Sequence, residues 1–167
     1  LKEVMVAPVS RVAVALGKVA GGSTVSLFQG LIVLSLAPVL GVNLSISQIV
    51  SLIGLMVMLA VMMTSLGILI AARQKSMEGF HMMMNFVLLP MFFLSGAFFP
   101  LRGVPVWMYL LSKLDPVTYG VDPLRQVSLQ ALVPPDLMHT VSLNPVTYNV
   151  MMMTSFSVLF LIPAVWL

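Results

Sequence analysis

Charge is what this sequence has least of. Only 8% of its 167 residues are Asp, Glu, Lys or Arg, and 60% are hydrophobic, whereas roughly 25% of the residues in a soluble domain are charged. A soluble fold with so few charges could not cover its surface with polar groups. The composition therefore excludes an ordinary soluble enzyme and predicts a polytopic membrane protein.

Cysteine is absent altogether, which excludes a disulfide framework and a thiolate metal site. The sequence also lacks the short motifs of phosphate loops, zinc proteases, serine hydrolases and calcium loops. Its net charge of +3 falls in a few short segments, so it bears on membrane topology and does not indicate nucleic-acid binding. We expect no nucleic-acid partner.

Four apolar stretches are long enough to cross a bilayer as helices. The predicted spans are 19–40, 49–72, 82–99 and 146–167. Pro100 is expected to end the third span. Asn144-Pro145 is expected to open the fourth as an N-cap followed by proline at the first helical position. The fold class is therefore an all-α membrane protein with four transmembrane helices.

Residues 1–18 carry four charged side chains and several apolar residues at helical spacing. This pattern predicts a short amphipathic helix at a membrane surface or against a partner, interrupted at Pro8. A basic flank beside the first span explains the same residues equally well.

Residues 101–143 are too polar and too often broken by proline to span a membrane. Trp107 belongs to a residue type that favours the membrane interface. Asp115-Pro116 predicts a helix start. Because Asp122-Pro123 repeats that signal, the helix after Pro116 is expected to be short and to restart. The segment is predicted to form short re-entrant or interfacial helices.

The distribution of basic residues predicts the topology. Residues 1–18 hold three basic residues and one acidic residue, and residues 73–81 hold two basic and one acidic. Short basic segments stay in the cytoplasm, which places 101–143 outside and the C-terminal end inside. His81 and His139 then lie on opposite sides of the membrane and cannot share a metal ion.

Two patterns leave alternatives open. His81 can carry a proton or can simply lie among the lipid headgroups, which is the reading we favour. The methionine runs 82–84 and 151–153 can bind soft metals or act as adaptable packing residues, and we favour packing. No ionisable residue lies inside a predicted span, which argues against a proton-coupled carrier or pump.

An ordered set of motifs resembles the permease subunits of type-2 ABC exporters, which include antibiotic-resistance, nodulation-factor and polysaccharide export permeases. The motifs are Phe93-Leu94-Ser95-Gly96-Ala97-Phe98-Phe99-Pro100, Pro105-Val106-Trp107, Asp115-Pro116-Val117-Thr118-Tyr119, and Asp122 with Arg125. Upstream, Ala7-Pro8-Val9-Ser10-Arg11 and Gly17-Lys18 are similar to that family's cytoplasmic coupling segment where it enters the third helix.

The resemblance implies a six-helix permease that works as a pair with two ATP-binding subunits. The chain starts at Leu1, and we expect it to lack the first two helices. Energy coupling to the ATPase would use Lys2, Glu3, Met5, Pro8 and Arg11. The extracytoplasmic gate or interface would use Gly96, Pro100, Pro105, Trp107, Pro116, Tyr119, Asp122 and Arg125. Pro123 departs from the family pattern, in which the helix continues.

The function expected from this resemblance is ATP-driven export of a hydrophobic, amphipathic or glycan-type substrate across a prokaryotic inner membrane. The chain itself would bind no cofactor, because ATP and Mg²⁺ would be held by the partner ATPase. Its partners would be that ATPase, a second permease copy and the bilayer. A membrane scaffold or assembly protein is the main alternative. An intramembrane enzyme is less favoured, because the sequence indicates no polar residues converging at one depth.

Overall fold

The computed structural model describes residues 10–99, 101, 103–130 and 132–166, with the side chains of Pro135, His139 and Thr140 left aside. Every regular element in this described part is a helix. In chain order the helices are α1 (Arg11–Ser35), α2 (Ile46–Arg73), α3 (Met77–Leu94), α4 (Val106–Leu114), α5 (Pro116–Leu129), α6 (Pro135–Val141) and α7 (Val146–Trp166). Helices α1, α2, α3 and α7 are long and apolar enough to cross a membrane, so the all-α, four-span prediction is confirmed.

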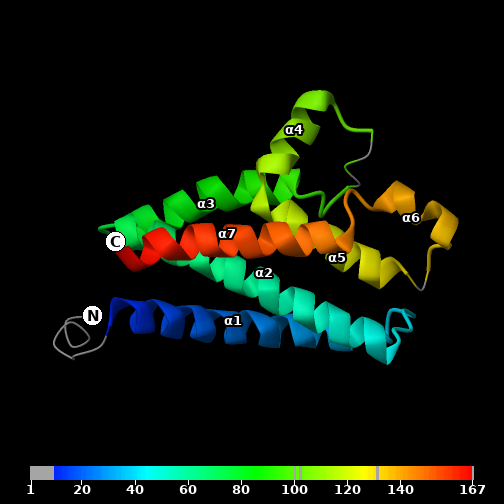
Figure 1. Ribbon diagram of the computed structural model, residues 1–167, viewed down its shortest axis with the longest axis horizontal. Coiled ribbons are helices and arrows are strands. Elements are labelled where there is room, and N and C mark those ends of the chain that lie inside the picture. Colours follow the sequence, from blue (N-terminus) through cyan, green and yellow to red (C-terminus); the bar gives the residue numbers. More distant parts are fainter. Residues whose placement is uncertain (1–9, 100, 102, 131, 167) are drawn as a thin grey trace.

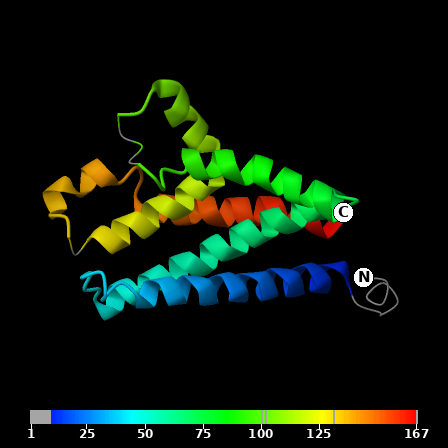
Figure 2. The same cartoon turned by 180° about the vertical axis from the view of Figure 1, so that it is seen from behind.

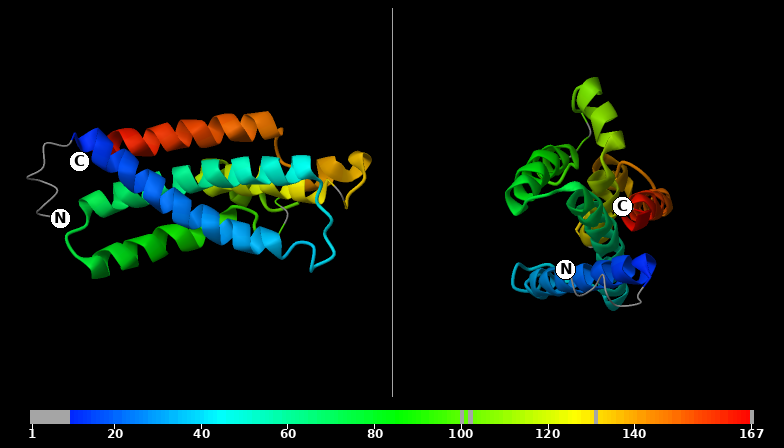
Figure 3. Two further views of the ribbon diagram at one scale, coloured as in Figure 1. Left: turned by 90° about the horizontal axis from the view of Figure 1, so that it is seen from below. Right: turned by 90° about the vertical axis from the view of Figure 1, so that its left-hand side faces the viewer.

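The long helix α2 occupies the centre of the bundle. It packs against α1, α5 and α7, and the view along the long axis shows α1 on one side of it and α3, α5 and α7 on the other (Figure 3). One core cluster joins Leu52 and Leu55 of α2 to Val127 of α5. A second joins Met62 of α2, Tyr119 of α5 and Met153 of α7.

The first span differs from its predicted bounds at both ends. Helix α1 begins at Arg11, because the Ser10 hydroxyl accepts a hydrogen bond from Ala13 N–H at 3.2 Å and caps it. It ends at Ser35, and Pro38 follows in a turn that Gly41 closes with φ of 78°. Residues 11–18 are thus the first two turns of the span itself, and a separate amphipathic helix extending to residue 18 is a wrong prediction. Residues 1–9 fall outside the described part.

The third span also differs. Ser76 caps α3 by accepting from Gly79 N–H at 3.1 Å, so the helix starts at Met77, five residues before the predicted start. It ends at Leu94, and Gly96 follows with φ of 76°. Left-handed glycine beyond the last turn is a common helix stop. The stop therefore comes before Phe99, and Pro100 is not what ends the helix.

The connections between successive spans lie at alternate ends of the bundle. The start of α1, the connection from α2 to α3 and the C-terminal end lie at one end, and the connection from α1 to α2 lies at the other with α5 and α6 (Figure 1). The view from behind shows the same arrangement (Figure 2). This arrangement is the one expected for a chain whose four long helices cross a membrane one after another. Helix α4 projects sideways from the bundle near the C-terminal end of α3 (Figure 1).

Candidate functional site

Helix α5 organises the end of the bundle that carries the predicted gate residues. We call the α5 corner the set formed by α5, the end of α3 through Gly96, and residues 143–149 at the start of α7. Nine of the fourteen residues of α5 are buried, although the helix is polar by sequence. Its buried polar residues must therefore find partners within the protein.

Asp115 starts α5 as predicted. Its carboxylate accepts from Val117 N–H at 3.0 Å and from the Thr118 hydroxyl at 3.1 Å, and Pro116 takes the first helical position. Burial raises the pKa of this carboxyl from 3.8 to about 6, against the opposing effect of those hydrogen bonds. The α5 corner thus has a group that gains a proton under mildly acid conditions.

Asp122 does not restart the helix, contrary to the prediction. Helix α5 runs unbroken from Pro116 to Leu129 with Pro123 inside it. Interior proline costs a backbone hydrogen bond and strains the preceding turn. The packing of Tyr119 and Val127 into the two core clusters offsets that cost.

The carboxylate of Asp122 instead binds the start of α7. It accepts from the backbone N–H groups of Leu143 and Asn144 at 2.9 and 3.1 Å, and from the Asn149 side-chain amide at 2.7 Å. A fourth donor is the Gln126 amide at 3.0 Å. Asp122 is only 2% exposed. Its two oxygens are therefore satisfied by four hydrogen-bond donors within the protein.

Polar side chains therefore converge at the α5 corner, and the expectation that none would do so is wrong. Gln126 also donates to the Asn144 carbonyl at 2.8 Å. Asn149 is fully buried. The cluster gives no sign of hydrolytic chemistry, because its amide donors are already bound to the carboxylate and to backbone oxygen. Among the described residues no group of three or more His, Cys, Asp or Glu could hold a metal ion.

The end of α3 is attached to the other side of α5. The Arg125 guanidinium donates to the Gly96 carbonyl, and the Thr118 hydroxyl makes a long contact of 3.4 Å with the Leu94 carbonyl. A Cβ at Gly96 would lie 2.8 Å from Leu101 Cγ. Glycine at position 96 is therefore required both by its positive φ and by the buried Leu101 side chain.

Helix α4 is held more loosely than α5. The Tyr119 hydroxyl donates to the Lys113 carbonyl at 2.7 Å, and α4 otherwise packs lightly on α3 and α5. Its apolar side chains are mostly exposed, with Trp107 at 63%. The helix lies sideways to the spans (Figure 1), as an interfacial helix would.

The predicted gate residues therefore divide into two groups. Gly96, Pro116, Tyr119, Asp122 and Arg125 meet at the α5 corner, whereas Pro105 and Trp107 lie on or beside α4 and face outward. Pro100 lies outside the described residues.

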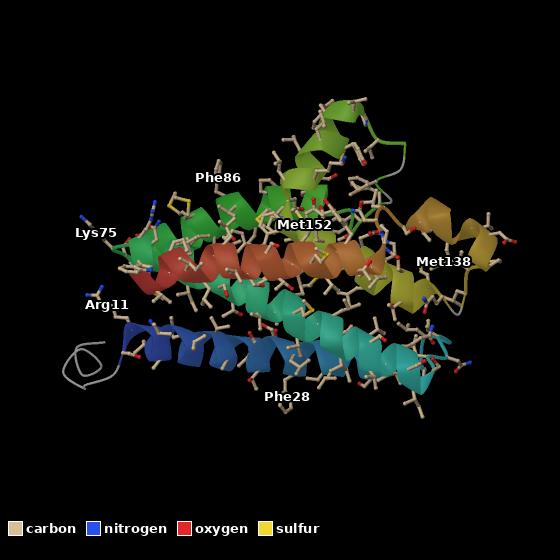
Figure 4. All side chains as sticks on the ribbon, viewed as in Figure 1. Arg11, Phe28, Lys75, Phe86, Met138 and Met152 are labelled. Atoms are coloured by element: carbon tan, nitrogen blue, oxygen red, sulfur yellow. The ribbon has the colours of Figure 1, made fainter. Side chains whose placement is uncertain are left out.

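Of the predicted coupling residues, the structure describes Arg11, which lies at the opposite end of the bundle. Arg11 is exposed as the first residue of α1, and it is labelled at that end in Figure 4. Lys2, Glu3, Met5 and Pro8 fall outside the described residues.

Sequence reasoning missed the part of the network contributed by α7 and α5. Gln126, Asn144 and Asn149 complete the shell around Asp122, but only Asn144 had been noted, as a helix cap. The missed signal was Asn149, the one strongly polar side chain in an otherwise apolar predicted span. Polar side chains inside spans usually face a partner.

Comparison with known sequences identifies the family. The sequence pattern of the ABC-2 type transporter matches residues 1–129, which is most of the chain and reaches the end of α5. The chain belongs to the ABC-2 type transporter family.

Curated relatives of this ABC-2 chain include the inner membrane transport permease YadH of Escherichia coli K12, and proteins of the same name from Escherichia coli O157:H7 and Shigella flexneri. Each is 29% identical over 125 residues, which cover 75% of this chain and 48% of the relative. The chain thus aligns with about half the length of these relatives. No solved structure matches it significantly.

Proposed function

We propose that this chain is part of the permease subunit of an ATP-driven exporter in a prokaryotic inner membrane. The family match over residues 1–129 carries the proposal. The relatives named inner membrane transport permeases support the location and the transport role. The substrate class we propose is hydrophobic, amphipathic or glycan-type, released from the cytoplasm to the outside.

The energy source we propose is an ATP-binding cassette subunit. In the described part of the chain the buried carboxylates, Asp115 and Asp122, lie on the short α5 segment and are occupied by hydrogen bonds. They form no chain of exchangeable groups along a span, as proton relays do. ATP and Mg²⁺ would bind in the partner, and this chain would perform no hydrolysis.

Coupling is proposed to enter at residues 1–11 and to leave at the α5 corner. Closure of two ATPase subunits would push the segment containing Lys2, Glu3, Met5, Pro8 and Arg11. Helices α1 and α2 would transmit the movement because they pack against each other. The α5 corner would then shape the exit path between two permease copies.

The proposal is tested with the full-length protein co-expressed with an ATP-binding cassette subunit of the same organism. Co-purification in detergent should recover the ATPase, and vesicles containing both should hydrolyse ATP faster than the ATPase alone. Pro8→Ala combined with Arg11→Ala should lower that stimulation several-fold without reducing expression. Lys113→Ala, at the other end, is the matched control. Failure to recover an ATPase, or full stimulation by the double variant, would favour a scaffold role instead.

A further inference from the structure

Among the described residues, the end of the bundle where α1 begins has more exposed positive than negative charge. Four exposed cations lie there with one exposed carboxylate, that of Glu78. The cations are Arg11, Lys18, Arg73 and Lys75. Figure 4 shows Arg11 of α1 and Lys75 of the connection between α2 and α3 at the same end of the molecule. We call these four residues the basic rim.

The opposite end has the reverse balance. Its described charges are Lys113 and Arg125 against Asp115, Asp122 and Asp136. Arg125 is engaged with the Gly96 carbonyl, and the Lys113 ammonium lies 4.6 Å from the centre of the Tyr109 ring. For the basic rim, by contrast, the structure records no ion pair among the residues it describes. Among the described residues, positive charge is therefore in excess at the basic rim and not at the opposite end.

Depth in the membrane decides what can neutralise this charge. Helix α1 has 25 residues and is about 37 Å long, several ångström more than a hydrocarbon core of about 30 Å. Lys18 is the eighth residue of α1, two turns and roughly 10 Å beyond Arg11 on the same side of the helix. Leu16 beside it is 49% exposed. An ammonium at this level extends along its stem to the phosphate layer.

We propose that the basic rim binds anionic phospholipid of the inner leaflet, with Arg11 and Lys18 contacting headgroup phosphates one above the other. A soluble ATPase cannot reach Lys18 beside exposed apolar side chains, whereas the lysine stem can carry its ammonium to the lipid phosphates. Anionic lipids attract basic residues placed next to a membrane span. The inference rests on charge and depth, and it holds whether or not the protein transports a solute.

Native mass spectrometry of the full-length protein tests the inference directly. The protein is released from vesicles of equal phosphatidylglycerol and phosphatidylethanolamine, without any ATPase present. The wild type should retain phosphatidylglycerol in preference to phosphatidylethanolamine. Lys18→Gln should reduce that preference roughly fivefold, as expected for the loss of one interfacial cation, and Arg11→Gln with Lys18→Gln should nearly abolish it.

Matched variants make the result decisive. Lys113→Gln removes an exposed lysine at the other end and should leave the preference unchanged, while Lys18→Arg should preserve it. Added phosphatidylglycerol should raise the melting temperature of the wild type more than that of Lys18→Gln. Equal retention of the two lipids by the wild type would overturn the proposal. So would an equal loss in Lys113→Gln, or a preference that appears only after the ATPase is added.

Discussion

At the scale of single residues, Asp122 is a tightly held side chain. It is buried, and two backbone N–H groups and two side-chain amides bind its carboxylate. Its partners come from α5, from the segment leading into α7 and from the first turn of α7. This one carboxylate therefore fixes where the last span begins relative to α5.

Replacement of Asp122 should destabilise the protein strongly. Asp122→Ala leaves several buried donors without an acceptor, each costing about 1–3 kcal/mol, so we expect the free energy of unfolding to fall by about 3 kcal/mol or more. Asp122→Asn keeps one acceptor oxygen and should cost less. Denaturant unfolding in detergent measures both, with Asp136→Ala on exposed α6 as the control. A loss below about 0.5 kcal/mol in Asp122→Ala would contradict the role assigned to this network.

Asp115 should make stability depend on pH. Its pKa in the folded protein is raised to about 6, so the folded state holds a proton that the unfolded chain, with a pKa near 3.8, has already lost. The stability that the protonated Asp115 contributes to the folded state is complete below a pH of about 4. It is lost as the pH rises through about 6. Asp115→Asn keeps the helix cap and removes the titration.

Melting temperatures between pH 4 and 7 check this sign. The difference between Asp115→Asn and the wild type should grow in favour of the variant from pH of about 4 to about 6 and then level off. The control variant Asp136→Asn should follow the wild-type curve. A difference that shrinks with rising pH would mean that the folded protein favours the charged form of Asp115.

At the scale of elements, α5 is held by several contacts with other helices, whereas α4 is held by few. Helix α5 is joined by hydrogen bonds to α3, to the start of α7 and, through Gln48 and the Val127 carbonyl at 3.2 Å, to α2. Helix α4 has one hydrogen bond from Tyr119 and a largely exposed apolar surface. The chain enters α4 past Gly96 and Gly103, both with positive φ. Any movement at this end is therefore expected at α4 before α5.

The two glycines provide a matched pair of substitutions. Both need a left-handed conformation, which costs roughly 1–2 kcal/mol with a side chain. An added Cβ at Gly96 would also meet Leu101 Cγ at 2.8 Å, whereas at Gly103 it would meet nothing within 4 Å. Gly96→Ala should therefore destabilise the protein more than Gly103→Ala.

A double variant separates strain from collision. In the background of Leu101→Ala, the extra cost of Gly96→Ala over Gly103→Ala should shrink, because the colliding atoms are gone. Unfolding free energies of the four combinations form the cycle. Purely additive effects at positions 96 and 101 would show that the Leu101 contact does not limit this site.

At the scale of the whole molecule, the bundle is packed on one side of each outer helix only. Phe28 of α1 and Phe86 of α3 are 67% and 78% exposed and point away from the bundle in opposite directions (Figure 4). Helix α3 has no fully buried residue in the described part. These apolar surfaces are suited to acyl chains or to neighbouring membrane helices.

The absence of cysteine permits a direct test of topology in cells. Lys75→Cys lies at the basic end and Gln130→Cys follows α5 at the other end. Since short basic connections stay in the cytoplasm, a membrane-impermeant maleimide should label Gln130→Cys in intact cells and Lys75→Cys only after permeabilisation. The reverse pattern would invert the proposed orientation and place the basic rim outside.

The sequence alone determined the class of the protein, the number of spans and the family resemblance. These follow from the length of apolar runs, the scarcity of charge and the order of motifs, all of which are local properties. It also placed the Asp115 cap, because an N-cap involves residues only two or three positions apart.

Only the tertiary structure decided what the buried polar groups do. Asp122 resembles a second helix cap in sequence, but its partners lie 21 to 27 residues away, at a distance along the chain that no local pattern encodes. The continuity of α5 through Pro123 depends likewise on packing against α2 and α7. Helix propensity is a weak local preference, and long-range contacts override it where they bury enough side chains.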